Sequence, residues 1–246
     1  GFRFAEFIGG KHANYHMGLY APGFAAQLDA ALTTRLLTEI GTAIGGLDAL
    51  AFVNQPVAWQ GVANPAALLA AGPSPSRAYK LALIAGDGEA TLKRSMSSHA
   101  RKKLKNKYSR FRDFGPSALT RATTPAEAAR IVDAFLTQKA ERFRTMGVPD
   151  PFVEPAMRLF LERAAMPDGS RHPSIELYSL DLDGRSVATY VGAVQGARFS
   201  GMATSFDMGS ETVKTSPGEL LLADLIRLKA GEGVAVFDLG VGEARY

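Results

Sequence analysis

The sequence has no cysteine and no long apolar run. Cysteine is absent from all 246 residues, which excludes disulfides, thiolate nucleophiles and cysteine-ligated zinc. This composition fits a reducing compartment, and we expect a cytoplasmic protein. The apolar runs fall well short of the roughly 18 residues that a membrane-spanning helix needs, and the first residues, GFRFAEFIGG, lack a signal-peptide core. We therefore expect no membrane span.

Catalytic and metal-binding motifs of fixed spacing are also missing. The chain has no G-x-S-x-G nucleophile elbow and no phosphate-binding P-loop. His12 and His16 stand four residues apart but lie among glycines, His99 falls in a basic segment, and His172 precedes a proline. None of these spacings suits a metal ion, so we expect no metal site.

The composition that remains is that of a globular protein, with one strongly basic segment. Hydrophobic residues make up 46% of the sequence and charged residues 21%, which is ordinary for a globular protein. The length suits one large domain or two small ones. Residues 89–114 have a narrow apolar stripe at helical spacing, and most of their other residues are basic. We expect one long helix there. Its basic side is either a solvated face or a surface for phosphates, an anionic polysaccharide or lipid, or nucleic acid. Nucleic acid is an unlikely partner, because Tyr108 and Phe111 fall on the apolar stripe and not among the basic residues.

The first 88 residues have mixed signals. Periodicity predicts a helix at 25–44 and strands at 47–53 and 78–84, separated by a proline-rich connection at 54–76. The later residues are more regular. Turn signals and periodicity predict a strand at 118–122, helices at 124–145 and 155–165, and strands at 174–182, 186–194 and 198–206.

The last three of these strands are predicted to form an antiparallel meander. Asp183-Gly184 is a strong hairpin signal between two of them. A helix beginning near Ser216 and a strand at 234–238 follow. A strand–helix–strand crossover predicts that this last strand runs parallel to 198–206. We therefore expect a mixed, mostly antiparallel sheet with one parallel βαβ unit.

The start of the last helix has a phosphate-site pattern. Ser216 suits the N-cap, Pro217 suits the first helical position, and Glu219 completes a capping box. The N–H groups of Gly218 to Leu220 and the positive end of the helix dipole could hold a phosphate or pyrophosphate. Ordinary helix capping explains the same residues, and the Glu219 carboxylate would compete with an anion.

This order of elements resembles the GNAT N-acetyltransferase fold. The SPG before the last helix and FD-x-G-x-G-x-x-x-Y after it resemble the CelD-like, cellulose-biosynthesis-associated branch, as do FIGGKHANYHMGLY and SMSSHARKKLK. The GNAT phosphate loop, Arg/Gln-x-x-Gly-x-Gly/Ala, is missing, and KTSPG at residues 214–218 takes its place. The resemblance implies an α/β (α+β) GNAT fold.

The resemblance also implies how the chain is divided. Related Fem-like aminoacyltransferases place two GNAT-like halves in one chain. By that comparison, residues 1–88 are a reduced GNAT-like N-terminal half and residues 89–115 a basic connecting helix. Residues 116–246 are then the acyltransferase core, which we expect to be truncated at its C-terminus.

For the acyl donor, the resemblance points to the middle of the strand at 198–206. In GNAT proteins a bulge there frees backbone N–H groups for the thioester carbonyl, and neighbouring backbone pairs with pantetheine like an added strand. Carried over, this places Gly201, Met202, Ala203 and Thr204 against acetyl-CoA or another acyl-CoA. A packing glycine or a simple bulge explains Gly201 equally well.

For the chemistry, the resemblance points to residues after the last strand. Asp238 or Glu243 would accept a proton from the incoming ammonium, directly or through water. Tyr246 would protonate the leaving thiolate, since a phenol has an ordinary pKa of about 10. Solvent-facing polar groups and a packing aromatic are the simpler explanation. Asp207 and Glu211 are second candidates.

We therefore expect an acyl-CoA-dependent N-acyltransferase, specifically an acetyltransferase, that acts on an amine of a small molecule or saccharide by direct attack. Two alternatives stay open. One is a Fem-like aminoacyltransferase that uses aminoacyl-tRNA, in which the basic helix would touch RNA. The other is a non-catalytic GNAT-like binding module in a polysaccharide or envelope pathway.

Overall fold

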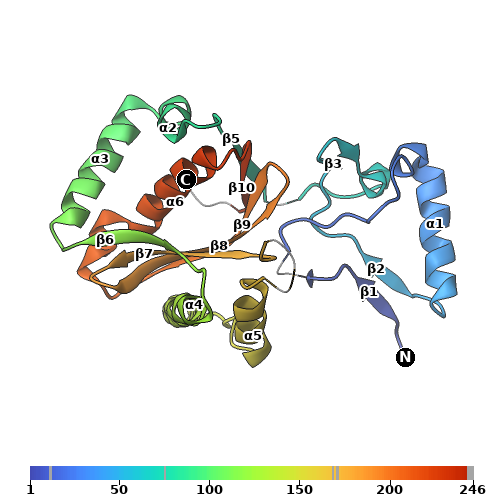
Figure 1. The fold of residues 1–246 in the computed structure, drawn as a ribbon. Helices are drawn as coiled ribbons and strands as arrows, with labels where there is room; N and C mark the ends of the chain where they lie inside the picture. The colour runs from blue at the N-terminus through green and yellow to red at the C-terminus, as the bar shows by residue number, and fades with distance from the viewer. Residues whose placement is uncertain (11–12, 75, 168, 170–171, 243–246) are drawn as a thin grey trace. The chain divides into compact units, whose positions relative to one another are not determined.

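A computed structural model describes residues 1–10, 13–74, 76–167, 169 and 172–242. The chain divides into two compact units (Figure 1). The first unit comprises Gly1–Ala78 together with the described residues from Gly240 onward, and the second comprises Tyr79–Leu239. Across the described ranges, the helices are neither long nor apolar enough for any of them to cross a membrane.

The second unit is built on a six-stranded mixed sheet in the order β5-β10-β9-β8-β7-β6. Strands β6 to β9 pair antiparallel, and β10 pairs parallel to β9, as the crossover predicted. The expected α/β class with a mixed sheet is therefore confirmed. The strands are β5 (Ala78–Ala82), β6 (Ser117–Arg121), β7 (Glu176–Leu182), β8 (Arg185–Gln195), β9 (Arg198–Phe206) and β10 (Val236–Val241).

The hairpin between β7 and β8 follows from its two turn residues. Asp183 and Gly184 have φ values of 48° and 75°, the left-handed pair that a two-residue turn needs to match strand twist. The turn sets the register of the central strands, which pair from Glu176 with Gly192 to Leu182 with Arg185. A short local signal thus positions the middle of the sheet.

Helices cover both faces of this sheet (Figure 1). On one face lie α4 (Pro125–Met146) and α5 (Pro155–Ala164). On the other lies α6 (Pro217–Gly231), with α2 (Gly88–Ser95) and α3 (Ser98–Arg112) packed against it. Burying each large apolar side chain stabilises the fold by about 1.5–3 kcal/mol. The α6 side buries Tyr178, Phe199, Leu221 and Phe237, and the α4 side buries Ile131, Phe135, Leu177 and Val191.

Helix α4 begins and ends as its sequence predicts. The Thr124 side chain accepts from the Glu127 N–H while the Glu127 carboxylate accepts from the Thr124 N–H, so the capping box is complete. Gly147 ends the helix with a left-handed φ of 68°. The residues buried under the helix recur at three- and four-residue spacing: Ala128, Ile131, Val132, Phe135 and Gln138.

The basic segment forms two helices, so the prediction of one long helix is wrong. Helix α2 covers Gly88–Ser95 and α3 covers Ser98–Arg112. Met96 is extended, and the Ser97 side chain accepts from the Ala100 N–H as a new N-cap. Serine hydroxyls compete with helical hydrogen bonds in this way, and the continuous apolar stripe concealed the break.

The strand that precedes this basic segment, β5, belongs to the large sheet. β5 lies beside β10 at one edge, and the Leu83 N–H donates to the Ala235 carbonyl at 2.8 Å. The expected N-terminal half, residues 1–88, includes this strand. Sheet membership depends on a partner about 150 residues away, so local sequence could not have revealed it.

The first unit is smaller than the second, and many of its large apolar side chains are exposed. β1 (Phe4–Glu6) pairs parallel with β2 (Ala49–Ala51), and β3 (Ala58–Trp59) pairs antiparallel with β4 (Val62–Ala63). The connecting helix α1 is Ala30–Ala43, not 25–44, because the Asp29 side chain accepts from the Leu32 N–H and caps it there. Two short 3₁₀ turns, Ala25–Gln27 and Pro65–Leu68, complete the unit.

Candidate functional site

A bulge interrupts β9 at the position that the sequence predicted. Opposite β8, Val191 pairs with Ala203 and Gly192 pairs with Gly201, so Met202 is the extra residue. Such a bulge disrupts the hydrogen-bond ladder locally and turns side chains aside. The Met202 side chain is 44% exposed.

Gly201 is required by close packing. A Cβ atom at this position would collide with the Tyr190 hydroxyl and would lie 3.1 Å from the Asp238 carbonyl oxygen. Gly192, its partner on β8, is equally restricted by the Phe199 ring. The simpler explanation of Gly201 as a packing glycine therefore holds alongside the bulge.

The first residues of β9 pair parallel with β10. The pairing joins Arg198 with Val236, Phe199 with Phe237, and Ser200 with Asp238. These pairs lie just before Gly201, and β9 continues to Phe206. The bulge thus lies next to the residues of β9 that pair with β10.

The two remaining residues predicted to line the cofactor make contacts inside the unit. The Thr204 hydroxyl donates to the Thr189 carbonyl at 2.9 Å. Ala203 packs against the apolar core under α4. Met202 is therefore the most exposed of the four residues 201–204.

Asp238 is part of a buried ion pair. Its Oδ2 atom accepts from Arg198 Nε at 3.1 Å and from Nη2 at 2.5 Å, and the Asp238 side chain is almost fully buried. The guanidinium competes with any incoming ammonium for this carboxylate. Sequence reasoning missed Arg198 as the partner, although the parallel pairing of the two strands brings them together. Glu243 and Tyr246 lie outside the described residues.

The start of α6 differs from the predicted capping box. Ser216 is left-handed, with φ 56° and ψ 65°, and within the described part of the chain its side chain makes no capping hydrogen bond. Its carbonyl instead accepts from the Glu219 N–H at 2.9 Å and the Leu220 N–H at 3.2 Å. The capping-box prediction is therefore wrong, whereas Pro217 is at the first helical position as expected.

This geometry changes the predicted phosphate site. Pro217 has no N–H, and the amides of Glu219 and Leu220 already donate to Ser216. Of the three amides proposed for a phosphate, two are thus engaged within the helix start. The Glu219 side chain extends to Lys107 on α3, with which it forms an ion pair.

A polar network joins α3 to α6 beyond that ion pair. The Tyr108 hydroxyl donates to Asp224 Oδ1 at 2.6 Å, and Arg227 Nη1 donates to the Tyr108 oxygen at 2.7 Å. Burial raises the pKa of Tyr108, and the hydrogen bond to Asp224 raises it further. The network fixes α3 beside the first turns of α6 and leaves Tyr108 protonated at neutral pH.

A family comparison places these features in context. Residues 98–246 match the family described as "Acetyltransferase (GNAT) domain". The chain belongs to this GNAT family. The match begins at the first residue of α3 and includes every element discussed above as a candidate site.

Solved structures resemble this chain at low identity. FemX is 8% identical with a TM-score of 0.50, over 68% of this chain and 54% of FemX. The C-terminal DUF2156 domain of a protein named as a lysylphosphatidylglycerol synthetase, from Agrobacterium fabrum, is 13% identical with a TM-score of 0.43, over 68% of this chain and 48% of its own. The chain thus spans about half the length of these structures. No curated protein sequence matches it.

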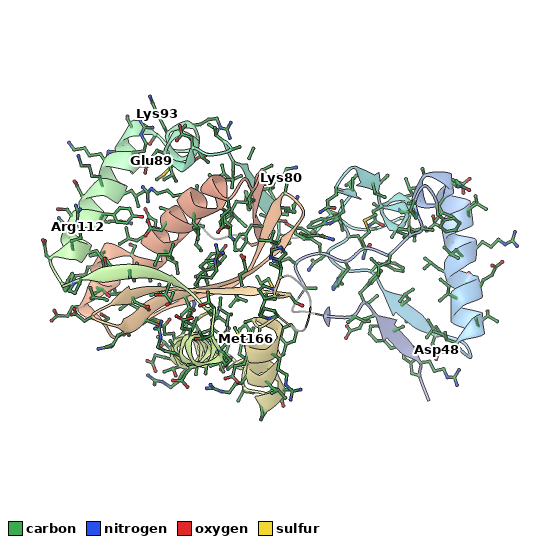
Figure 2. All side chains as sticks on the ribbon, in the orientation of Figure 1. Asp48, Lys80, Glu89, Lys93, Arg112 and Met166 are labelled. Atoms are coloured by element: carbon green, nitrogen blue, oxygen red, sulfur yellow. The ribbon has the colours of Figure 1, made fainter. Side chains whose placement is uncertain are left out.

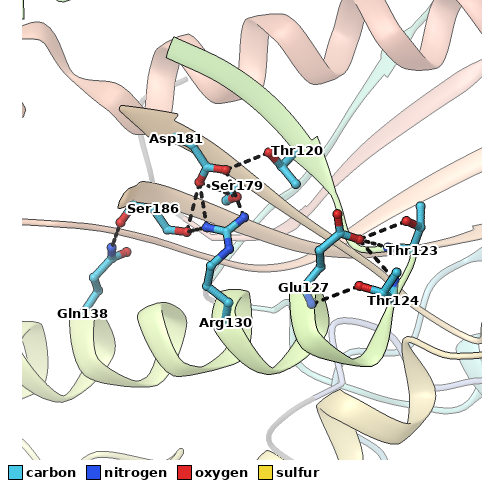
Figure 3. A network of polar contacts seen from close by, with 9 residues as sticks. All are labelled: Thr120, Thr123, Thr124, Glu127, Arg130, Gln138, Ser179, Asp181 and Ser186. Atoms are coloured by element: carbon cyan, nitrogen blue, oxygen red, sulfur yellow. Dashed lines mark hydrogen bonds and ion pairs between the residues drawn. The ribbon is translucent and has the colours of Figure 1, made fainter. Parts of the chain in front are cut away.

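The opposite face of the GNAT sheet holds a second polar cluster that the sequence did not reveal (Figure 3). Arg130 on α4 donates to both oxygens of Asp181 at 3.0 Å, and Thr120 and Ser179 donate to the same carboxylate at 2.7 Å. Burial acts to raise the pKa of Asp181, but these hydrogen bonds outweigh it and the pKa lies below its ordinary value. The cluster anchors α4 to the sheet.

The second-choice carboxylates are placed after β9. Asp207 Oδ2 accepts from Arg185 at 3.1 Å, and its Oδ1 accepts from the Gly209 N–H. Glu211 is exposed on the 3₁₀ turn Glu211–Thr215. A surface hollow of about 420 Å³ lies along α5, away from all these residues, and is lined by Ala156, Leu159, Phe160, Arg163, Ala164, Met166 and Ser174.

Proposed function

We propose that this GNAT protein is an N-acyltransferase that moves an acyl group, most simply acetyl, from acyl-CoA to an amine of a small molecule or saccharide. The bulge at Met202, close to the residues of β9 that pair parallel with β10, carries the proposal. A bulge there offers backbone N–H groups to a thioester oxygen, and the rest of β9 offers backbone to pantetheine.

The proposed reaction is direct attack. A neutral amine nitrogen bonds to the thioester carbonyl carbon, and the resulting oxyanion is stabilised by N–H groups at the bulge. The carbon–sulfur bond then breaks, and Tyr246 protonates the CoA thiolate. Glu243, or Asp238 through water, accepts the proton that the amine loses. Because Arg198 binds Asp238, we favour Glu243 for this step.

The bulge can be tested with one backbone substitution. Met202→Pro removes the N–H, and we expect kcat for acetyl transfer to fall by roughly 10²–10³. Met202→Ala keeps the N–H and serves as the control, with a change of less than about threefold expected, since the side chain is half exposed. CoA release is measured with a thiol reagent over a panel of amines, and CoA affinity and Tm establish that the proline variant is folded. Equal kcat values for the two variants would contradict the oxyanion role.

A second candidate is transfer of an aminoacyl group from tRNA, as in the Fem-like proteins. Two observations favour it: the fold likeness to FemX and the basic helices α2 and α3. Calorimetry with acetyl-CoA and with tRNA separates the candidates. Salt-dependent tRNA binding without CoA binding at millimolar concentration would favour the second, and binding of neither would favour a non-catalytic module.

Two finer assignments belong to the same proposal. The SPG and FD-x-G-x-G-x-x-x-Y patterns support the CelD-like branch and, with it, a saccharide amine as acceptor. The parallel β1–α1–β2 arrangement supports a reduced GNAT-like half in the first unit. Activity on amino sugars in the same amine panel tests the first of these assignments.

A further inference from the structure

The segment of helices α2 and α3 has a higher net positive charge than the whole chain. Residues 87–114 contain nine Lys and Arg against three Asp and Glu, a net charge of +6, whereas the entire chain carries +4. All other residues together are therefore net negative. Lys93 and Arg112 lie on the outer side of these helices, facing away from the sheet (Figure 2). So dense a surface of one sign favours an anionic ligand.

One side of α3 borders the start of α6. Lys103, Lys107 and Arg110 are spaced four and three residues apart, which places them on one side of the helix. We call these three residues the α3 flank. Lys107 reaches the Glu219 carboxylate on the first turn of α6. Helix α3 also packs against the 3₁₀ turn Glu211–Thr215, which lies in the connection from β9 to α6.

The backbone beside this flank is poorly suited to hold a phosphate alone. Pro217 has no N–H, and the amides of Glu219 and Leu220 both donate to the Ser216 carbonyl. A GNAT protein without the glycine-rich loop needs positive charge from another source at this point. Lysine and arginine side chains form strong charge-assisted hydrogen bonds with phosphates.

We propose that the α3 flank binds the phosphates of the acyl-CoA donor, an inference that rests on the proposed function. Side-chain cations replace the glycine-rich backbone loop. In the free protein the Glu219 carboxylate pairs with Lys107, and a phosphate with more negative charge displaces it. The carboxylate is well placed for this exchange because it is partly exposed.

The inward position of the aromatic residues favours a compact phosphate ligand over a nucleic acid. Phe111 is buried, and Tyr108 donates to Asp224 and Leu220 on α6. Apart from His99 in the first turn, the exposed residues of α3 therefore offer charge without aromatic rings. Base stacking on aromatic rings is what single-stranded nucleic acid binding commonly uses.

The test compares two double variants of the same helix. Lys103→Ala with Arg110→Ala removes two charges from the flank, seven residues apart. Lys105→Ala with Arg112→Ala removes two exposed charges at the same spacing from the opposite side. Because both lose the same net charge, long-range attraction falls equally. We expect calorimetry to give a Kd for CoA about tenfold or more higher in the flank variant, and within about twofold of wild type in the control.

Two further measurements identify the phosphates as the group that is bound. Transfer from acetyl-pantetheine, which lacks phosphates, should be equal in the two double variants. Glu219→Gln should bind CoA several-fold more tightly than wild type, because it removes the competing carboxylate. A loss of affinity in Glu219→Gln would contradict the exchange at Lys107.

The outcomes separate the inference from the function on which it rests. If wild type binds CoA and both double variants bind it equally, the inference is wrong and the proposed function stands. If wild type neither binds CoA nor uses acetyl-pantetheine, the proposed function fails. Selective loss of tRNA binding in the flank variant, with CoA affinity unchanged, would overturn the inference in favour of RNA.

Discussion

The two units of this protein bury their apolar side chains to very different extents. In the second unit Tyr178, Phe199, Leu221 and Phe237 are almost completely inaccessible. In the described part of the first unit, the buried apolar side chains are the small ones of Ala25, Pro65 and Ala66, whereas large ones such as Ile8 and Leu19 are fully exposed. The second unit therefore has a core of its own, and the first derives little stability from apolar burial.

The sheets of the first unit are also smaller and less covered than that of the second. In the first unit β1 and β2 form a two-stranded parallel pair of three residues each, a size that is marginal in isolation, and parallel strands are ordinarily covered on both faces. The second unit has six strands with helices on both faces. Matched substitutions in the two units test whether this difference governs stability.

Leucine truncation should give the largest contrast. Leu221→Ala on α6 removes a fully buried side chain and should lower the free energy of unfolding by about 4 kcal/mol. Leu32→Ala on α1 removes a side chain that is nearly half exposed, with an expected cost below about 1 kcal/mol. Urea unfolding followed by circular dichroism measures both. Equal losses would show that the first unit has a core comparable to the second.

Ion pairs provide the next contrast. Lys229 is buried beside Glu176 at 2.6 Å and Glu232 at 2.8 Å, and Lys229→Met should cost about 3 kcal/mol because it leaves carboxylates without their cation. Arg35→Met breaks the exposed pair with Glu39 in the first unit and should leave unfolding unchanged. Adding Glu176→Gln to Lys229→Met should recover part of the loss. A variant that gains nothing from this addition would argue against unpaired charge as the cause.

The Asp181 cluster makes the second unit sensitive to acid. The pKa of the Asp181 carboxyl group is lower in the folded state than in the unfolded state. The stabilisation from this group is therefore present above the unfolded pKa of about 3.9 and is lost as pH falls through the folded pKa. Asp181→Asn should cost about 2 kcal/mol at pH 7, a value moderated by the partial exposure of Arg130. Unfolding measured from pH 7 to pH 3 should show a shallower decline in the variant than in wild type. Parallel curves would assign the acid sensitivity to other groups.

Glycine replacement should have the smallest effect. A Cβ atom on Gly88 would collide with the Arg227 backbone on α6, so Gly88→Ala should cost between about 1 and 2 kcal/mol through displacement of α2. Gly72→Ala, in the first unit, meets open space and should change stability by less than about 0.5 kcal/mol. The midpoint of thermal unfolding reports both. A neutral Gly88→Ala would mean that the two helices adjust without cost.

Local signals made much of the second unit predictable. Asp183-Gly184 gave the hairpin, Thr124 with Glu127 gave the start of α4, and Gly201 gave the bulge in β9. Each depends on residues close in sequence or on an order of elements that restricts topology. The parallel direction of β10 followed from the crossover rule for the same reason.

The errors arose where distant partners or competing local signals decide the outcome. Ser216 is the N-cap residue of α6 as predicted, but its backbone is left-handed, and the Glu219 carboxylate pairs with the distant Lys107 in place of a capping box. Asp238 was identified as a candidate base without its partner Arg198. The Asp181 cluster gathers residues up to about 60 positions apart, and no sequence period marks such a set. Side-chain partnership at this range is a property of the folded sheet.

The concentration of basic residues on α2 and α3 makes the second unit an electric dipole. Positive charge gathers on two helices while the rest of the chain is net negative. In physiological salt this field is screened beyond about 8 Å from the surface. An anion within that distance is attracted toward α3 before any contact forms. The same asymmetry means that a cation-exchange matrix would hold the protein by one face.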